Sequence, residues 1–590
     1  MEIKLKGIPV SPSVAIGPAY PFHVSTISVQ RFTVNDTAVE LKRLETAFAT
    51  SRDELIVLRD QTQEELGEQH ASIFHSHLDM LEDIAFRPEI ERRLKEENLN
   101  VEFLVQDLID RYTKMMEQID DPLFRERSMD FVDIGRRVLN NLTHAETETL
   151  ETLERPSIVV AHDLSPSETA NMDMPNTLGI VTNEGGPTSH MAILARAFDI
   201  PSVVGLQTVT KLVSADDTII IDGTRGVVII DPLPETLAFY EKEKARIEAE
   251  RLAITQSAIE GPCLTQDGHE IQTFANIELL AETRNSIAAH CQGVGLYRTE
   301  FLYMNRPSLP GEDEQFHSYR KVLEAMAPLP VTMRTLDLGG DKVMPHLQRE
   351  VEPNPQLGWR SIRMCLDRPD IFKAQLRAML RASVFGKMRI MFPMITGIDQ
   401  FREARDIVDQ VIADLTARGV EFNPDVEIGS MIEVPAAATI ADKLAEECDF
   451  FCIGTNDLIQ YCLAADRVNP RTAELYQPTH MAVLRTVKHI LDEARKAQIS
   501  CTICGEMAGD PMLTELLVGM GADSLSMSSV SLPMVRAEIA NTRLPTAKRL
   551  AKKILDMGSV SEITAFLQER HDSRDTINLL RHKVNVAQKD

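Results

Sequence analysis

The most chemically suggestive segment of the sequence runs from Gly185 to His190 and ends in a single histidine. Two glycines, a proline and two hydroxyl residues precede His190, and the apolar residues after it predict a helix. His190 would therefore lie at a turn that opens a helix, where backbone N–H groups are unpaired and the helix dipole favours anions. Because imidazole is a nucleophile near neutral pH, His190 could accept a phosphoryl group. From this segment alone, a histidine that merely caps a surface turn is the alternative.

A second set of reactive side chains lies far downstream, where predicted strands end. Forked guanidinium donors suit phosphate and carboxylate, and the set contains Arg298, Arg334, Arg360 and Arg467. Glu433 and Asp457 supply hard oxygen ligands of the kind that Mg²⁺ takes when substrate phosphate completes its coordination. Salt bridges among these residues are the alternative, but their shared position at strand ends favours a binding site.

Two cysteines near the end of the chain, Cys501 and Cys504, fit the spacing of a redox C-x-x-C motif. They lie on a predicted strand, however, whereas redox pairs normally open a helix. A strand also directs residues three apart to opposite faces. We therefore expect Cys504 to be a single functional thiol and Cys501 to pack in a core, with a thiol oxidoreductase as the rival interpretation.

The elements that must position these residues follow one another in blocks. Residues 1–20 predict one or two strands, residues 34–149 a bundle of about four helices, and residues 156–232 a compact α/β unit. Residues 234–258, rich in Glu, Lys, Arg and Ala, predict one exposed helix. From Gly261 onward, eight apolar segments alternate with helical ones, which predicts a (β/α)8 barrel whose strands end at the second set of side chains.

The predicted fold is therefore a multidomain α/β chain, with a helical bundle inserted into a histidine-bearing α/β domain and a C-terminal (β/α)8 TIM barrel. The expected domain limits are residues 1–20 with 150–233 for the α/β domain, 21–149 for the helical domain, 234–260 for the linker helix, and 261–590 for the barrel.

Composition excludes several classes of function. The formal net charge is −27 and no basic tract is present, so nucleic acid is not an expected partner. No apolar run reaches the roughly 20 residues that span a bilayer, and the first residues do not resemble a signal peptide. Eight cysteines spread over a long chain favour reduced thiols and a cytoplasmic location.

The segment Gly185–His190 with the helix after it resembles the phosphohistidine segment of the phosphoenolpyruvate-utilising enzymes. Long stretches of the predicted barrel resemble the same family: Gly295–Phe301, Arg334–Lys342, Pro355–Arg360, Gly454–Leu458 and Cys504–Ala508. The helical block before the histidine unit narrows the resemblance to the enzymes I of the sugar phosphotransferase system, over essentially the whole chain.

This resemblance implies that phosphoenolpyruvate binds in the barrel with Mg²⁺ and that His190 takes its phosphoryl group. A histidine of the small carrier protein HPr would receive the group next, and Cys504 would protonate the leaving enolate to give pyruvate. The resemblance also implies supporting contacts, namely Asn456 and Arg467 toward the substrate, Glu300 and Glu506 toward the arginines and the thiol, and Thr169 toward His190. A swivelling histidine domain, HPr docking on the helical domain and a homodimer formed through the barrel are further expectations.

Two other interpretations stay open at this point. A dikinase or synthase would phosphorylate its histidine from ATP, but the sequence lacks a Gly-rich phosphate loop and the length for a nucleotide-grasping domain. A non-catalytic regulator would use the phosphohistidine unit only as a binding module, whereas the complete set of arginines, carboxylates and thiol favours an enzyme. The tail after about residue 570 receives no role.

Overall fold

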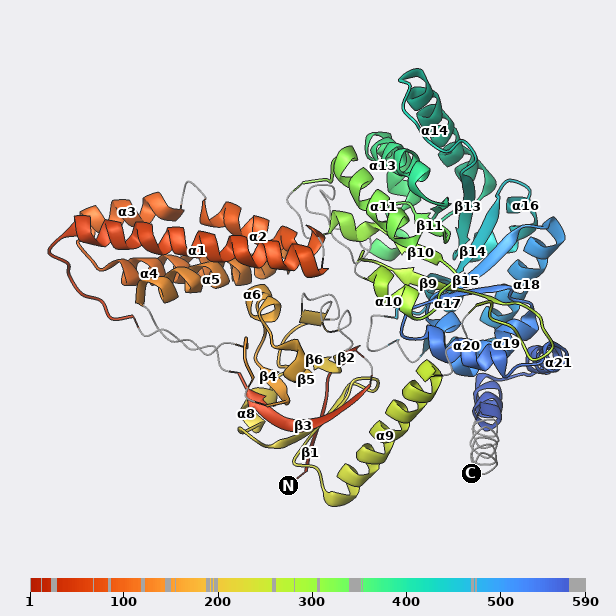
Figure 1. Cartoon of the computed structure of the whole chain (residues 1–590), viewed down its shortest axis with the longest axis horizontal. Helices are drawn as coiled ribbons and strands as arrows, with labels where there is room; N and C mark the ends of the chain where they lie inside the picture. The colour runs from red at the N-terminus through yellow and green to blue at the C-terminus, as the bar shows by residue number, and fades with distance from the viewer. Residues whose placement is uncertain are drawn as a thin grey trace. The chain divides into compact units, whose positions relative to one another are not determined.

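The computed structural model describes residues 2–571 apart from short stretches: 12, 23–28, 67, 83–85, 118–121, 144–149, 154, 187–190, 193–194, 196–199, 257–260, 281, 305–307, 339–351, 353, 468–471 and 473–474. The chain divides into two compact units, one reaching Leu252 and the other beginning at Ala253. Figure 1 shows the chain, with labels on many of its helices and strands. None of the described helices is both long and apolar enough to cross a membrane.

The first unit contains an eight-stranded sheet in the order β1-β8-β7-β3-β4-β5-β6-β2. Its strands are β1 (Ile3–Lys6), β2 (Ile8–Ser11), β3 (Val14–Pro21), β4 (Ser157–Ala161), β5 (Thr177–Thr182), β6 (Ser202–Val204), β7 (Thr218–Asp222) and β8 (Val227–Ile230). Strands β3 to β6 pair in parallel and the remaining pairs are antiparallel. The short helices α6 (Pro166–Ala170) and α8 (Val209–Leu212) connect them.

The N-terminal segment forms three strands, where the sequence predicted one or two. The extra strands exist because of pairing with distant segments: β1 pairs with β8 and β2 pairs with β6. Between them, Gly7 passes so close to β6 that an added Cβ would lie 2.5 Å from the carbonyl oxygen of Val204. Local patterning could not reveal these pairings, and β8 itself escaped prediction.

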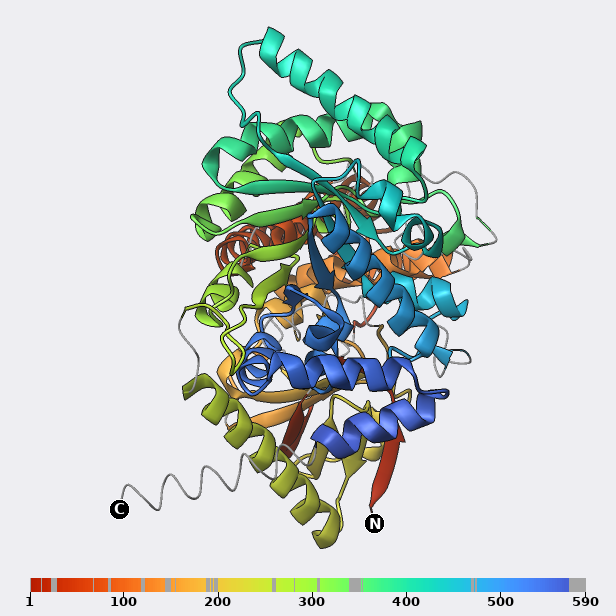
Figure 2. The same ribbon diagram turned by 90° about the vertical axis from the view of Figure 1, so that its right-hand side faces the viewer.

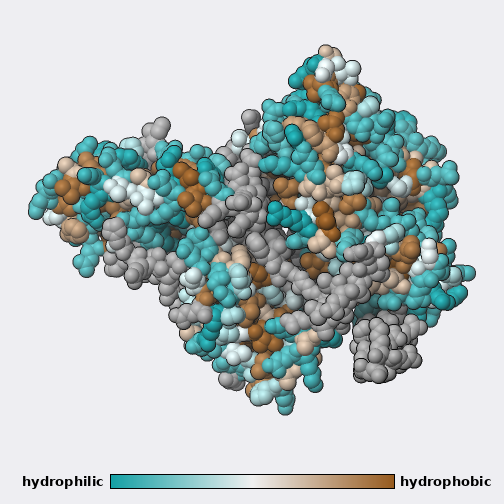
Figure 3. All heavy atoms as spheres, in the orientation of Figure 1, coloured by the Kyte–Doolittle hydropathy of each residue, from teal (hydrophilic) through white to brown (hydrophobic). Residues whose placement is uncertain are grey.

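A helical bundle with its own core is inserted between β3 and β4. Its helices are α1 (Thr37–Leu66), α2 (Glu68–Leu81), α3 (Phe86–Glu97), α4 (Val101–Glu117) and α5 (Pro122–Thr143). Buried residues such as Leu55, Leu104 and Val138 form the core, while the face seen in Figure 3 is largely hydrophilic. The described bundle thus has five helices where about four were expected. Among the described side chains of the highly charged α3, Ile90, Arg93 and Leu94 are buried, so its apolar periodicity is weak.

The second unit is a closed barrel of eight parallel strands, as the sequence predicted. The strands are β9 (Gln272–Ile277), β10 (Val294–Arg298), β11 (Val331–Arg334), β12 (Met388–Phe392), β13 (Glu427–Ile432), β14 (Phe450–Gly454), β15 (Ser500–Cys504) and β16 (Ser524–Met527). Strand β16 pairs with β9 and closes the barrel. The multidomain α/β fold with a C-terminal TIM barrel is confirmed.

Helices surround the strands of the barrel, as Figure 2 shows. They are α10 (Glu282–Ala288), α11 (Glu312–Met326), α12 (Ile362–Asp367), α13 (Pro369–Ala382), α14 (Ile398–Ala417), α15 (Pro435–Thr439), α16 (Ala441–Leu444), α17 (Thr455–Leu463), α18 (Met481–Ala497), α19 (Pro511–Met520), α20 (Leu532–Ala540) and α21 (Leu544–Leu555). A single helix, α9 (Pro234–Gln256), follows β8 and matches the exposed helix that was predicted for residues 234–258.

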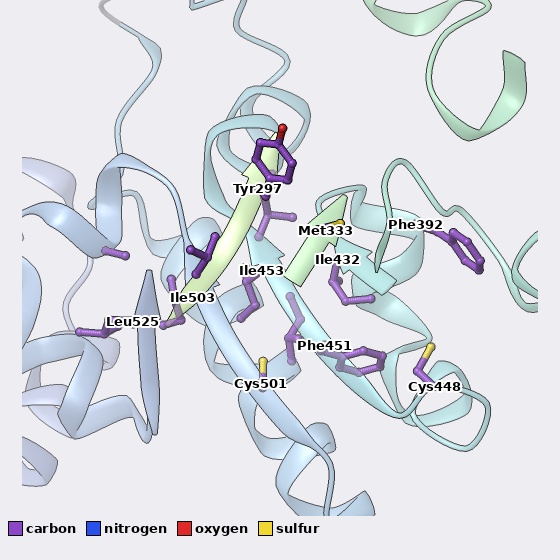
Figure 4. Packing of buried hydrophobic residues seen from close by; sticks show 14 of the residues in the cluster. Tyr297, Met333, Phe392, Ile432, Cys448, Phe451, Ile453, Cys501, Ile503 and Leu525 are labelled. Carbon is purple, nitrogen blue, oxygen red and sulfur yellow. The ribbon is translucent and has the colours of Figure 1, made fainter. Parts of the chain in front are cut away.

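Alternation along the barrel strands produces two cores. Side chains such as Phe451, Ile453, Cys501 and Ile503 belong to the large cluster beneath the helices, part of which Figure 4 shows. Inward-facing side chains fill the barrel interior, and we call this second set the interior plug: Leu296, Met391, Met431, Phe450, Cys452 and Cys504. Cys501 and Cys504 therefore lie in different cores, as strand geometry requires.

Candidate active site

The carboxyl-terminal ends of the barrel strands bring charged side chains together above the interior plug. We call this set the rim: Glu300, Arg334, Asp337, Arg360, Glu433 and Asp457. Arg334 ends β11, Glu433 follows β13, and Asp457 lies in the first turn of α17. All six rim residues are buried. Active sites of TIM barrels lie at this end because loops after several strands converge there.

Acidic and basic groups alternate along the rim. Arg334 donates to Glu300 and, through Nη1 at 2.9 Å, pairs with Oδ2 of Asp337. Oδ1 of Asp337 accepts from Nη2 of Arg360, also at 2.9 Å. Arg360 lies 3.6 Å from Asp457, whose other oxygen lies 3.5 Å from the exposed Arg467. Five of the six rim residues therefore belong to one continuous chain of ion pairs, which ends on Arg467; Glu433 lies outside that chain.

The arginines of the rim remain charged although they are buried. Burial lowers the pKa of Arg334 and of Arg360, but neighbouring carboxylates, Asp337 foremost, more than offset it and raise both values. Within the described structure, the Nε atoms of both arginines are buried without a hydrogen-bond partner. A buried donor that lacks a partner is costly, so these two atoms are suited to receive an anionic ligand.

Glu433 and Asp457 are the residues predicted to bind a metal. Burial, followed by the charges of Asp457 and Asp337, raises the pKa of Glu433 to about 8. One oxygen of Glu433 accepts the backbone N–H of Met394 at 2.6 Å. A hard divalent cation bound by Glu433 and Asp457 would offset the repulsion between the two carboxylates. Among the described residues, no group of three or more His, Cys, Asp or Glu side chains could hold a metal.

Arg298 lies at the end of β10 and is about one-third exposed, with 31% of its side chain accessible. It pairs with Glu278, which directly follows β9. The neighbouring Glu282 is half-buried and accepts two backbone N–H groups; partial burial, with the charge of Glu278, raises its pKa to about 7. The Arg298 side chain is thus positioned by Glu278, which follows β9, whereas the side chains of Arg334 and Arg360 are positioned by Asp337.

The turn after β15 carries Cys504 and Glu506. Gly505 has a φ of 106°, and an added Cβ there would lie 2.4 Å from Oγ1 of Thr455, so glycine fits this turn. The turn brings Glu506 to Asn456, whose Nδ2 and Oδ1 lie 3.4 Å and 3.1 Å from Oε1 and the backbone nitrogen of Glu506. Cys504 is buried, with Sγ 4.0 Å from the carbonyl oxygen of Gly295.

The predicted nucleophile, His190, lies outside the described residues, as do Pro187, Thr188 and Ser189. Thr169, the residue predicted to contact it, is fully buried on α6. Its hydroxyl donates to the carbonyl oxygen of Ser165 at 2.8 Å. The hydroxyl proton is therefore committed, and only the lone pairs of the Thr169 oxygen remain to accept another hydrogen bond.

Comparison with known proteins assigns the family. The description "PEP-utilising enzyme" matches in three parts: its N-terminal part over residues 6–127, its mobile domain over 153–226 and its PEP-binding domain over 253–544. A phosphoenolpyruvate-protein phosphotransferase of Geobacillus stearothermophilus is 42% identical over 96% of this chain and 98% of its own length. The chain belongs to the phosphoenolpyruvate-protein phosphotransferase family. A relative of the same name from Bacillus subtilis is 40% identical over 96% of this chain and 99% of its own.

Sequence reasoning had overlooked two residues that hold the arginines of this phosphotransferase rim. Asp337 lies within the strand-end segment that begins at Arg334, and Glu278 directly follows the first barrel strand. Both are carboxylates at strand ends, so the rule that revealed the arginines would also have revealed them. Their contacts with Arg334, Arg360 and Arg298 required the fold, because the partners come from different strands and loops.

Proposed function

We propose that the chain transfers the phosphoryl group of phosphoenolpyruvate to its own His190 and then to a histidine of the carrier protein HPr, releasing pyruvate. This would be the first step of a phosphotransferase system for sugar uptake. The observation that carries the proposal is the rim, in which two buried, charged arginines lie among four buried carboxylates at the strand ends. Phosphoryl transfer requires mainly positioning and charge neutralisation, and the rim provides both.

The substrate carries a phosphate and a carboxylate, and the proposed contacts divide between them. Arg334 and Arg360 offer buried guanidinium donors, while Arg298, Arg467 and Asn456 are partly exposed. The unpartnered Nε atoms of Arg334 and Arg360 would gain hydrogen bonds when an anion binds. Fixed donors of this kind need no reorganisation as charge shifts during transfer.

Glu433 and Asp457 would hold Mg²⁺ together with oxygens of the substrate. The ion supplies positive charge to the phosphoryl oxygens during transfer. Glu433 must be ionised to act as a ligand, and a cation beside it would favour the ionised form over the neutral form that burial favours. The donor set therefore suits a metal that enters with its substrate.

Thr169 would select the reacting nitrogen of His190. Because its hydroxyl proton is used on Ser165, Thr169 can only accept, so it would receive the Nδ1–H of the imidazole. Nε2 then keeps its lone pair for attack on phosphorus. The histidine must meet both the barrel site and HPr, which implies that its domain swivels.

Cys504 would donate the proton that converts the leaving enolate to pyruvate. A neutral thiol is needed for this donation, and Cys504 lies buried in the apolar interior plug. To reach the substrate, the thiol would turn from the carbonyl oxygen of Gly295 toward the rim.

The proposed domains have distinct tasks. Residues 1–20 with 150–233 would form the swivelling phosphohistidine domain, 21–149 the HPr-binding domain, 234–260 the linker, and 261–590 the substrate-binding and dimerisation domain. In the structure, β3 runs one residue past the first limit, to Pro21. We further propose a cytoplasmic homodimer.

The decisive experiment supplies phosphoenolpyruvate and Mg²⁺ and measures acid-labile, base-stable phosphate on the protein together with released pyruvate. We expect labelling of the wild type and none of His190→Ala. A chelator should abolish labelling, and excess Mg²⁺ should restore it. Labelling of His190→Ala would refute the assignment of the nucleophile, and labelling from ATP but not from phosphoenolpyruvate would favour a dikinase.

A further inference from the structure

Asp337 is the central carboxylate of the rim, with 3% of its surface exposed. Its two oxygens are used by two different arginines: Oδ2 by Nη1 of Arg334 and Oδ1 by Nη2 of Arg360, each at 2.9 Å. Arg334 comes from the end of β11, whereas Arg360 precedes α12. Asp337 is thus a side-chain bridge between these two segments, in addition to the backbone hydrogen bond from Ser361 to Leu338.

We propose that Asp337 is a positioning residue that holds Arg334 and Arg360 as one rigid pair aimed at the phosphoryl group. The inference rests on the proposed function, because it takes these arginines as substrate contacts. With Nη2 of Arg334 on Glu300 and Nη1 of Arg360 on Gln356 and Tyr461, each guanidinium is fixed in its plane. Both unpartnered Nε atoms then have defined directions.

Removing the negative charge of Asp337 distinguishes a role in positioning the arginines from a role in binding the substrate. Asp337 is an anion in a site that takes an anion, so its charge opposes substrate binding. Its contribution to geometry acts on the transfer step, where small displacements of the reacting groups are expensive. Neutralising Asp337 should therefore slow transfer without weakening the binding of phosphoenolpyruvate, and a residue that merely stabilises the fold would not produce that split.

The barrel contains a matched control. Glu312, at the start of α11, also bridges two arginines: it accepts from Nε of Arg377 and from Nη1 of Arg381, each at 2.6 Å. Glu312→Gln therefore removes the same charge from the same kind of bridge, outside the rim. The chain also has a built-in reporter, because its only tryptophan, Trp359, directly precedes Arg360.

The experiment compares Asp337→Asn with Glu312→Gln in the full-length chain. The rate constant of His190 phosphorylation is measured by rapid quench at saturating phosphoenolpyruvate and Mg²⁺. Affinity is measured in a His190→Ala background, in which no transfer occurs, by titrating phosphoenolpyruvate with Mg²⁺ and following Trp359 fluorescence. Melting temperatures report folding.

For Asp337→Asn we expect transfer to slow about 10- to 100-fold, while the Kd for phosphoenolpyruvate stays within about threefold of wild type or becomes tighter. Glu312→Gln should leave both unchanged. If Asp337→Asn does not fold, Asp337→Glu keeps the charge but displaces the bridge, and the same split is expected. An unchanged transfer rate, or a tenfold weaker Kd with normal transfer, would overturn the inference. A wild type that takes no phosphoryl group would instead refute the proposed function.

Discussion

Two layers of the barrel interior differ sharply although they are adjacent. The rim is a chain of alternating charges, in which the Arg334 and Arg360 guanidiniums are bridged by Asp337. The interior plug beneath it is apolar and rich in sulfur, with Met391, Met431, Phe450 and two cysteines. A hydrogen bond to Cys504 and burial raise the pKa of Cys452 well above its usual value, so that thiol stays neutral.

The difference shows how one barrel separates electrostatics from packing. Charges in the rim lie over a medium of low polarity, in which their interactions with each other and with an anion are stronger than in water. Met431 joins the layers, with Sδ 3.8 Å from Nη1 of Arg334. Substitutions in the rim should therefore affect transfer more than folding, and substitutions in the plug should do the reverse.

The largest effect is expected for Arg334→Lys in the rim. Lysine keeps the charge, but its three donors share one nitrogen, so it lacks the planar fork through which Arg334 reaches Glu300 and Asp337 and directs Nε elsewhere. Labelling from phosphoenolpyruvate should fall at least about 100-fold. Labelling in reverse, from phosphorylated HPr to His190, should remain, because that step does not use the rim. Loss of both labelling reactions would contradict a role confined to the barrel.

Cys504→Ala tests whether Cys504, a residue of the interior plug, acts on the substrate at the rim. Pyruvate release should slow about 10- to 100-fold, because the enolate would lack its proton donor. His190 should still be labelled from phosphorylated HPr. Cys501→Ala is the control, since Cys501 lies in the outer core. Equal loss in both variants would indicate a packing effect in place of acid catalysis.

Met391→Ala changes the packing of the interior plug and leaves the rim residues unchanged. Deleting a fully buried methionine should lower the free energy of unfolding of the barrel by about 2–5 kcal/mol. Denaturant unfolding would measure this loss. The rate of labelling from phosphoenolpyruvate below the unfolding transition should change only about threefold. A much larger change in rate would show that the plug shapes the rim directly.

Glu282→Gln should produce the smallest effect, visible only in the dependence of stability on pH. The pKa of Glu282 is raised from 4.5 to about 7, so between these values the folded chain keeps a proton that the unfolded chain has lost. The associated stability is complete below pH 4.5 and is lost as the pH rises through 7, by about 3 kcal/mol.

Glutamine cannot ionise but still accepts the N–H groups of Glu278 and Leu279, so the variant should lose stability less steeply between pH 4.5 and 8. Melting temperatures across this range would measure the difference. Glu403→Gln, on the exposed surface of α14, should leave the wild-type slope unchanged. Parallel slopes for Glu282→Gln and the wild type would contradict the prediction.

Much of the architecture followed from local patterns. The eight barrel strands could be predicted because each is a short apolar run followed by a helix, and the strand-end rule then located Arg334 and Glu433. The five-helix bundle and the three N-terminal strands were only partly predicted. Helix α3 has a weak apolar stripe, and β1 and β2 depend on partners roughly 200 residues away.

The sequence by itself determined the residue types at the strand ends, and with them the prediction of an anion-binding and metal-binding site in the barrel. Only the tertiary structure decided which charged residues form ion pairs with each other, because an ion pair depends on distances of a few ångströms between segments far apart in the chain. Asp337 illustrates this limit of sequence-based prediction. The sequence showed that Asp337 follows Arg334, but not that it pairs with Arg360. The same folding placed Cys504 in the apolar plug and Cys501 in the outer core.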